Sequence, residues 1–148
     1  ITIANVIDET LPRVDVVMLG GTLRKGHRYV YGPLALSGLA HIHADIAVIC
    51  PGSFVASRGF MTEFPQMAEL KSALMKSAST SIALLDSSKA NNRGTYCFAN
   101  LSDFQYVIMN SGSGTQMVSD AIETISECEF RPTLVSADFI PAHPQEEV

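Results

Sequence analysis

The chain has 148 residues, which is enough for one domain with a full hydrophobic core. Hydrophobic residues make up 47% and charged residues 17%, which excludes a disordered acidic tail, and no apolar run approaches the roughly 18 residues of a membrane-spanning helix. The formal net charge of -5 argues against direct binding to nucleic acid, because phosphate contacts need a basic face.

Apolar runs with strand character recur along the chain. They lie at residues 1–3, 14–19, 46–50, 81–85, 106–109 and 133–136. Most are continuous rather than alternating, a pattern typical of strands buried on both faces of a parallel sheet.

Segments of helical period separate these runs. Pro33 and Pro65 are each well placed in a first helical turn, and a third helix is predicted over residues 115–127. In the second helix the predicted apolar face leaves Lys71 and Lys76 outside it. The alternation predicts an α/β fold, a layered, open and mostly parallel sheet flanked by helices. We expect one domain over residues 1–140 and a flexible tail over 141–148.

Cysteine usage indicates the compartment. Cys50, Cys97 and Cys128 are odd in number, widely spaced and set among apolar neighbours, which predicts reduced, buried thiols rather than disulfides. We therefore expect a soluble, cytoplasmic protein.

The strand at 81–85 leads into Leu84-Leu85-Asp86-Ser87-Ser88-Lys89, the most informative motif of the chain. An apolar strand that ends in a polar loop places its functional groups at the carboxyl edge of a sheet, where open α/β folds bind ligands. Asp86 and Lys89 there have the chemistry to hold a phosphorylated polyol, although a plain Asp-Ser turn has the same sequence.

Three further sets of candidate residues lie after predicted strands. Gly20 and Gly21 allow a ligand to approach the backbone and Thr22 offers a hydroxyl, while a tight turn explains the glycine pair equally well. Arg24 leads a local positive cluster that could attract an anion, against the default of a solvated loop. Gly52 opens a long segment, 51–65, that we interpret as a ligand-covering loop.

Metal and covalent chemistry have little support. His41 and His43 lack an evident third ligand, and neither a nucleophile elbow nor a Cys-His signature is present. We expect no catalytic residue, no metal and no cofactor.

The order of these motifs resembles the effector domain of DeoR-type bacterial transcription regulators. The matching runs are Thr2-Ile3-Ala4-Asn5 (where the family has a strand ending in Thr-Asn-Ser), Val17-Met18-Leu19-Gly20-Gly21-Thr22-Leu23-Arg24, Tyr31-Gly32-Pro33, Ala44-Asp45-Ile46-Ala47-Val48, Arg58-Gly59-Phe60-Met61-Thr62, Glu69-Leu70-Lys71, Leu84 to Lys89, and Val107-Ile108-Met109-Asn110-Ser111-Gly112. The chain departs from the family pattern at three places: Val6 follows Asn5 where a small hydroxyl residue is usual, Asn110 stands where the family usually has Asp, and Cys50-Pro51-Gly52 replaces a stretch richer in glycine and alanine.

The resemblance implies a fold similar to ribose phosphate isomerase and the CoA transferases, and a sensor of phosphorylated sugars that does not convert them. It implies a homo-oligomer that contacts DNA only through a winged helix-turn-helix outside this sequence, and no membrane partner. The implied ligand-binding residues are Asn5, Gly20, Gly21, Thr22, Arg24, Gly52, Asp86 and Lys89.

Two alternatives stay open. A sugar-phosphate aldose-ketose isomerase would use Asp86 and Glu63 as proton carriers and Lys89 to polarise the carbonyl. A structural oligomerisation domain that has lost its pocket would bind no sugar phosphate.

Overall fold

The computed structural model describes residues 1–137. Within that range the elements are, in chain order, α1 (Thr2–Thr10), β1 (Thr22–Leu23), β2 (Val30–Tyr31), α2 (Pro33–Leu39), β3 (Ala44–Ile49), β4 (Ser53–Val55), β5 (Gly59–Thr62), α3 (Pro65–Lys76), β6 (Ala78–Leu85), the short 3-10 helix η1 (Ser87–Lys89), β7 (Tyr96–Ala99), a second 3-10 helix η2 (Leu101–Asp103), β8 (Tyr106–Met109), α4 (Ser113–Glu123) and β9 (Thr133–Ser136).

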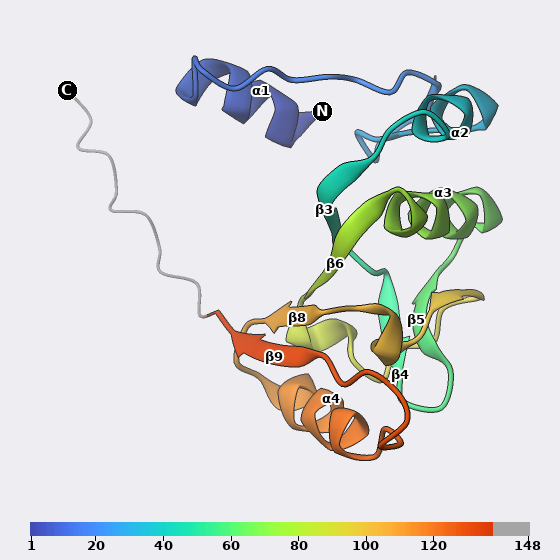
Figure 1. Ribbon diagram of the computed structural model, residues 1–148, viewed down its shortest axis with the longest axis vertical. Coiled ribbons are helices and arrows are strands. Elements are labelled where there is room, and N and C mark those ends of the chain that lie inside the picture. The colour runs from blue at the N-terminus through green and yellow to red at the C-terminus, as the bar shows by residue number, and fades with distance from the viewer. Residues whose placement is uncertain (138–148) are drawn as a thin grey trace.

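A four-stranded parallel sheet in the order β3-β6-β8-β9 is the centre of the fold (Figure 1). The predicted layered α/β architecture is confirmed, as are the strands at 46–50, 81–85, 106–109 and 133–136. The strand order advances in one direction along the chain. Because parallel crossovers are almost always right-handed, this order places every crossover on the same face of the sheet.

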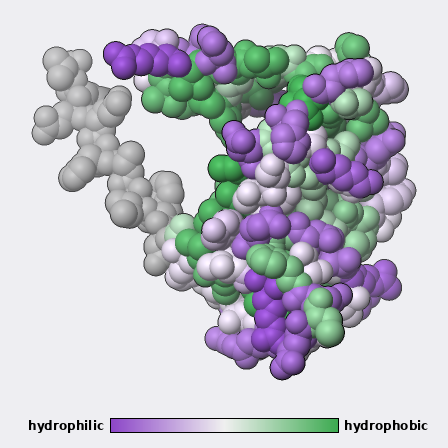
Figure 2. Space-filling model, in the orientation of Figure 1, coloured by the Kyte–Doolittle hydropathy of each residue, from purple (hydrophilic) through white to green (hydrophobic). Residues whose placement is uncertain are grey.

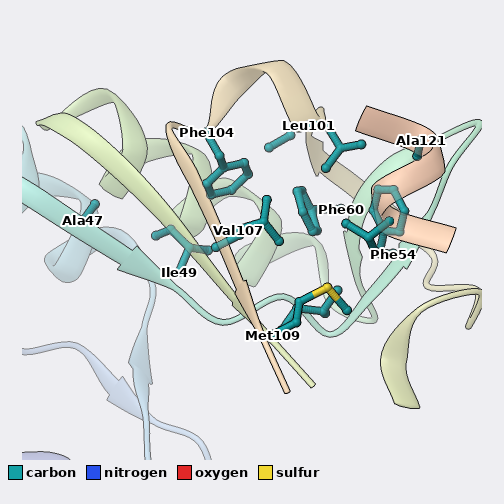
Figure 3. Close-up of a cluster of buried hydrophobic side chains, with 13 residues drawn as sticks. Ala47, Ile49, Phe54, Phe60, Leu101, Phe104, Val107, Met109 and Ala121 are labelled. Carbon is teal, nitrogen blue, oxygen red and sulfur yellow. The ribbon is translucent and has the colours of Figure 1, made fainter. Parts of the chain in front are cut away.

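The core lies on that face, which we call the covered face. Ile49, Ala83, Val107 and Met109 point from the sheet into one cluster with Val118 of α4, and each is 2% exposed or less. Three phenylalanines extend the cluster toward η2: the Phe60 ring lies 5.0 Å from that of Phe54 and 4.9 Å from that of Phe104 (Figure 3). Offset and edge-on aromatic pairs of this kind add stabilisation beyond the burial of their area.

The opposite face of the sheet, which we call the open face, is equally apolar but exposed. Ile46 and Val48 are each 57% exposed, Leu84 45% and Val135 37%. The strand pairing puts Leu84, Ile108 and Val135 in one row across β6, β8 and β9. None of the described helices that pack on the core lies on this row, in keeping with the one-sided crossovers.

The segment 51–65 is not the predicted ligand-covering loop. It forms the antiparallel hairpin β4–β5, which pairs with β7 into a second, three-stranded sheet. All four residues of β5 are buried, and Phe60 supplies much of the core. Burial of these apolar side chains, rather than contact with a ligand, explains the order of this segment.

Two strands predicted near the N-terminus are wrong. Ile1 is the N-cap of helix α1 and residues 2–3 begin that helix, whose apolar Ile3, Val6 and Ile7 recur at helical spacing. Residues 14–19 are not a strand, because a strand needs a hydrogen-bonded neighbour and no described strand pairs with them. Val17 is 80% exposed, and α1 lies apart from the sheet (Figure 1). Figure 2 shows hydrophobic atoms at the surface in this upper part of the molecule.

The three predicted helices are confirmed as α2, α3 and α4. α2 packs on α3 through a second apolar cluster of Ala35, Leu39 and Leu70. The cysteines are free, but all three are exposed rather than buried. No described helix is long and apolar enough to cross a membrane. The predicted domain boundary at 140 and the tail at 141–148 lie outside the described residues.

Candidate functional site

Asp86 stands at the carboxyl end of β6, as predicted, and begins η1. Its carboxylate accepts a hydrogen bond of 2.9 Å from the backbone N–H of Ser88, so it acts as the N-cap of this short helix. Hydrogen bonds from the side chain and backbone of Ser88 lower the pKa of Asp86, and the positive charge of Lys89 lowers it further. The carboxylate is therefore ionised and exposed. It has lone pairs for further acceptor contacts, because an ionised carboxylate offers about four acceptor sites.

The loops after β6 and β8 are fastened to each other. The backbone N–H of Ser87 donates to Asn110 Oδ1 at 2.8 Å, and Thr115 Oγ1 donates to the carbonyl of Asn110 at 3.0 Å. A Cβ on Gly112 would collide with Ser87 Oγ, so only glycine allows this approach. The run Asn110-Ser111-Gly112 thus positions the Asp86 loop. Asn110, where the family usually has Asp, meets the same requirement, because an oxygen acceptor is what Ser87 needs.

A hollow of about 420 Å³ opens at this edge, between the ends of β6 and β8. Its lining is apolar along the strands and polar at their ends: Leu84, Leu85, Asp86, Ile108, Met109, Asn110 and Ala137. The volume lies in the range of small-ligand sites, and an apolar lining with a few polar groups is typical of them.

Two lysines come from elements near this edge of the sheet, and neither of them lines the hollow. Lys89 of η1 is exposed, whereas Lys71 of α3 is only 9% exposed and donates to the carbonyl of Cys50 at 2.7 Å. Cys50 directly follows β3, the strand next to β6. Lys71 was predicted to lie outside the apolar face of its helix, which is wrong. The signal that could have revealed it is its spacing, four residues after Met67 and three before Leu74, which places it on the apolar face.

Gly52 follows Cys50 at the same edge, but its amide is already engaged. Its N–H donates to the carbonyl of Met61 at 3.0 Å, which closes the β4–β5 hairpin. Next to it, Ser53 is 4% exposed, and its Oγ is the single buried side-chain polar atom without a partner within the described part of the chain. No sequence signal points to this hydroxyl, because its isolation depends on tertiary packing.

Gly20, Gly21, Thr22 and Arg24 form a separate group around the β1–β2 hairpin. Gly21 has φ +110°, and a Cβ there would lie 2.6 Å from the carbonyl oxygen of Tyr31, so the tight turn explains this glycine. Thr22 pairs with Tyr31 in the hairpin.

Arg24 projects from this hairpin onto aromatic rings. Its guanidinium donates to Tyr29 Oη at 2.8 Å and stacks over Phe64, 3.0 Å from the ring centroid. A cavity of about 280 Å³ adjoins it, lined by Arg24, Tyr29, Tyr31, Phe64, Gln66 and Met67. Neither Asp86 nor Lys89 belongs to this lining.

Asn5 is the predicted site residue farthest from expectation. It is exposed on α1, whereas the prediction placed it at the end of a strand. α1 is fastened to the following segment at Arg28, whose carbonyl accepts from the amino terminus at 2.9 Å and whose guanidinium donates to Thr2 at 3.2 Å. The structure therefore brings Gly52, Asp86 and Lys89 to one sheet edge and leaves Asn5 away from the end of a strand.

The residues considered for a metal site and for an isomerase are placed as follows. Within residues 1–137, no three His, Cys, Asp or Glu side chains are grouped so that they could hold a metal ion. Glu63, the second carboxylate of the isomerase alternative, accepts a hydrogen bond from Thr95 Oγ1 at 3.1 Å.

Comparison with known families identifies the family. The model of the DeoR C terminal sensor domain matches residues 1–111, which is most of the chain. The chain belongs to this family. The match ends within the loop that follows β8, so it covers both Asp86 and Asn110.

A curated relative gives the family a regulatory context. The chain is 28% identical over 95 residues to the HTH-type transcriptional repressor GlcR of Bacillus subtilis (strain 168), a match that covers 64% of this chain and 36% of the relative. The chain thus spans about a third of the length of that repressor. A DeoR sensor domain is a regulatory module, and the matches point to regulation rather than catalysis.

Proposed function

We propose that this sensor domain binds a phosphorylated sugar at the carboxyl edge of the parallel sheet. The observation that carries the proposal is the hollow at the ends of β6 and β8, with the ionised Asp86 in its wall and Lys89 in the adjoining helix η1. Asp86 would accept from sugar hydroxyls, and Lys89 would pair with phosphate oxygens. Gly52 would allow close approach of the ligand without donating its amide.

The hairpin residues have a secondary place in this proposal. Arg24 and Thr22, with Gly20 and Gly21, would contribute to ligand binding from the β1–β2 side, where the aromatic contacts of Arg24 hold its guanidinium in place. Asn5 is the weakest of the predicted contacts, because α1 presents it to solvent.

Ligand binding would control DNA binding by a helix-turn-helix domain outside this sequence, in a cytoplasmic homo-oligomer. The name of the B. subtilis relative supports this role, since that protein is an HTH-type repressor. By linkage, the ligand must bind one arrangement of the subunits more tightly than the other, and about 1 to 3 kcal/mol of coupling is enough for a switch.

A thermal-shift screen against phosphorylated sugars and their unphosphorylated parents tests the proposal. A ligand at about a hundred times its dissociation constant adds roughly 2.7 kcal/mol of stability, a shift of several degrees for a domain of this size. We expect one phosphorylated sugar to produce the shift and its parent sugar to produce none.

Matched variants separate binding from stability. Lys89→Ala should weaken the ligand by roughly 1 to 3 kcal/mol and leave the free protein as stable as before, because the side chain is exposed. Leu74→Ala removes a side chain that packs against both apolar clusters and should do the reverse. The proposal would be contradicted if no sugar phosphate raised the melting temperature. It would also be contradicted if the two substitutions changed stability and ligand affinity equally.

A further inference from the structure

Lys71 is a buried cation at the ligand edge of the sheet. Its side chain is 9% exposed, its Nζ donates to the carbonyl of Cys50 at 2.7 Å, and the ring of Phe98 on β7 lies 5.2 Å away. An ammonium carries three N–H donors, and a single carbonyl accepts one of them. Burial of an ammonium costs free energy unless its hydrogen bonds are completed. A lysine with only a structural contact at this position would therefore destabilise the fold.

The position of this ammonium follows from the topology. Cys50 is the first residue after β3, and Asp86 is the first after β6, so the two loops leave neighbouring parallel strands at the same edge. α3 runs back across the covered face and delivers Lys71 to the Cys50 loop. Lys89, in η1, lies close enough to Lys71 for its charge to act on it. Two lysines from different elements therefore approach one edge, and the predicted site included only Lys89.

We propose that Lys71 is a second ligand-binding cation, which together with Lys89 holds a doubly charged phosphoryl group at this edge. This inference rests on the proposed function and deepens it, because two lysines select a dianion over a neutral sugar or a monoanion. A bound anion would give the ammonium, which already donates to the Cys50 carbonyl, further charged acceptors. Burial disfavours the charged form of Lys71 in the free protein, and the bound phosphoryl group favours it.

Electrostatics give this role a measurable signature. Burial lowers the pKa of Lys71 from 10.5 to about 8; Cys50 raises it in part, and Lys89 lowers it further. The group is therefore partly neutral near pH 8 in the free protein. A bound dianion favours the ammonium, so binding at this pH should draw a proton from the buffer.

The test is calorimetric titration with sulfate at pH 8, in two buffers of different ionisation enthalpy. Sulfate is a tetrahedral dianion that does not itself titrate near this pH, so any proton taken up belongs to the protein. We expect the unaltered chain to take up about half a proton per sulfate, because a group at its pKa is half protonated. Lys71→Met should remove the uptake and weaken sulfate at least tenfold.

Two further variants control the result. Lys71→Arg keeps a permanent charge and should retain sulfate binding without proton uptake, which a purely structural lysine would not produce. Lys76→Met removes an exposed lysine from the last turn of the same helix and should change neither quantity. Circular dichroism of each variant verifies folding, and Lys71→Arg keeps the test decisive if Lys71→Met does not fold.

The outcomes also separate this inference from the function on which it rests. If the unaltered chain binds sulfate or a phosphorylated sugar and Lys71→Met binds it equally well with the same proton uptake, Lys71 is structural and the inference is wrong while the sensor role stands. If the unaltered chain binds neither sulfate nor any phosphorylated sugar, both are overturned.

Discussion

The two faces of the parallel sheet are built from the same kinds of residue, but one face is buried and the other is exposed to solvent. On the covered face Val107 of β8 is fully buried, and on the open face Val48 of the edge strand β3 is 57% exposed, although both are valines of one sheet. Hydrophobicity along the strands does not distinguish them. The direction in which the strands are added does, because right-handed crossovers that all advance the same way deliver their helices to a single face.

The candidate site lies at an edge where residues of both faces meet. The hollow at the ends of β6 and β8 has Leu84 and Ile108 of the open face in its wall, together with Met109 of the covered face. The covered face supplies the rigid support, and the open face leaves the edge accessible. The contrast between the faces therefore bears on function as well as stability, and the substitutions below are chosen to break it or to sharpen it.

Removal of an aromatic ring on the covered side should have the largest effect. Phe60→Ala deletes a fully buried ring that contacts Phe54 and Phe104, and we expect a loss of about 3 to 5 kcal/mol in the free energy of unfolding, measured by urea denaturation. Phe130→Ala is the control, because Phe130 is 53% exposed and should change stability little. A loss below about 1 kcal/mol for Phe60→Ala would mean that this cluster is not packed in solution.

The buried lysine on the covered side should give stability a distinct pH dependence. The pKa of Lys71 is about 8 in the folded chain, against 10.5 for an ordinary lysine. The unfolded chain therefore binds more protons between these pH values, and the contribution of Lys71 to stability rises with pH across that window. The difference of about 2.5 units corresponds to on the order of 3 kcal/mol at 1.36 kcal/mol per unit.

Comparison with Lys71→Met isolates this effect, because the other titrating groups are common to both proteins. We expect the stability of the unaltered chain, relative to Lys71→Met, to be lowest below pH 8 and to increase by that amount as the pH approaches 10.5. Urea denaturation at a series of pH values measures the difference. Parallel curves for the two proteins would mean that the Lys71 ammonium is hydrated in the folded state.

The sequence predicts the strands of the parallel sheet and the helices that cover it, but not the structure of the segment 14–19 or of the hairpin β4–β5. Continuous apolar runs identified β3, β6, β8 and β9, and first-turn prolines identified α2 and α3, because these signals are local. The segment 14–19 is as apolar as these strands, but strand formation depends on a partner that local sequence does not reveal. The hairpin β4–β5 was missed for the converse reason: its partner β7 lies more than thirty residues away, at Tyr96–Ala99.

At the candidate site, too, the sequence predicted some positions and missed others. The positions of Asp86 and Lys89 followed from one strand and its end, and the structure places both at the expected edge. Lys71 was missed because a lysine on a helix was assigned to the solvent side, whereas its face is decided by Met67 and Leu74. The role of Asn110 as an acceptor for Ser87 required the spatial proximity of two loops, which no single stretch of sequence contains.

The smallest loss of stability is expected for a substitution on the open face, and it tests the comparison of the two faces most directly. Val48→Ala removes the same atoms as Val107→Ala, but from a side chain that is 57% exposed rather than fully buried. We expect Val107→Ala to cost about 2 kcal/mol, from two methyl groups at roughly 0.8 kcal/mol each and the cavity they leave, and Val48→Ala to cost less than about 0.5 kcal/mol. Equal losses in urea denaturation would mean that the open face is covered in solution. A dependence of the Val48→Ala loss on protein concentration would then identify a second copy of the chain as the cover, because stability that comes from association varies with concentration.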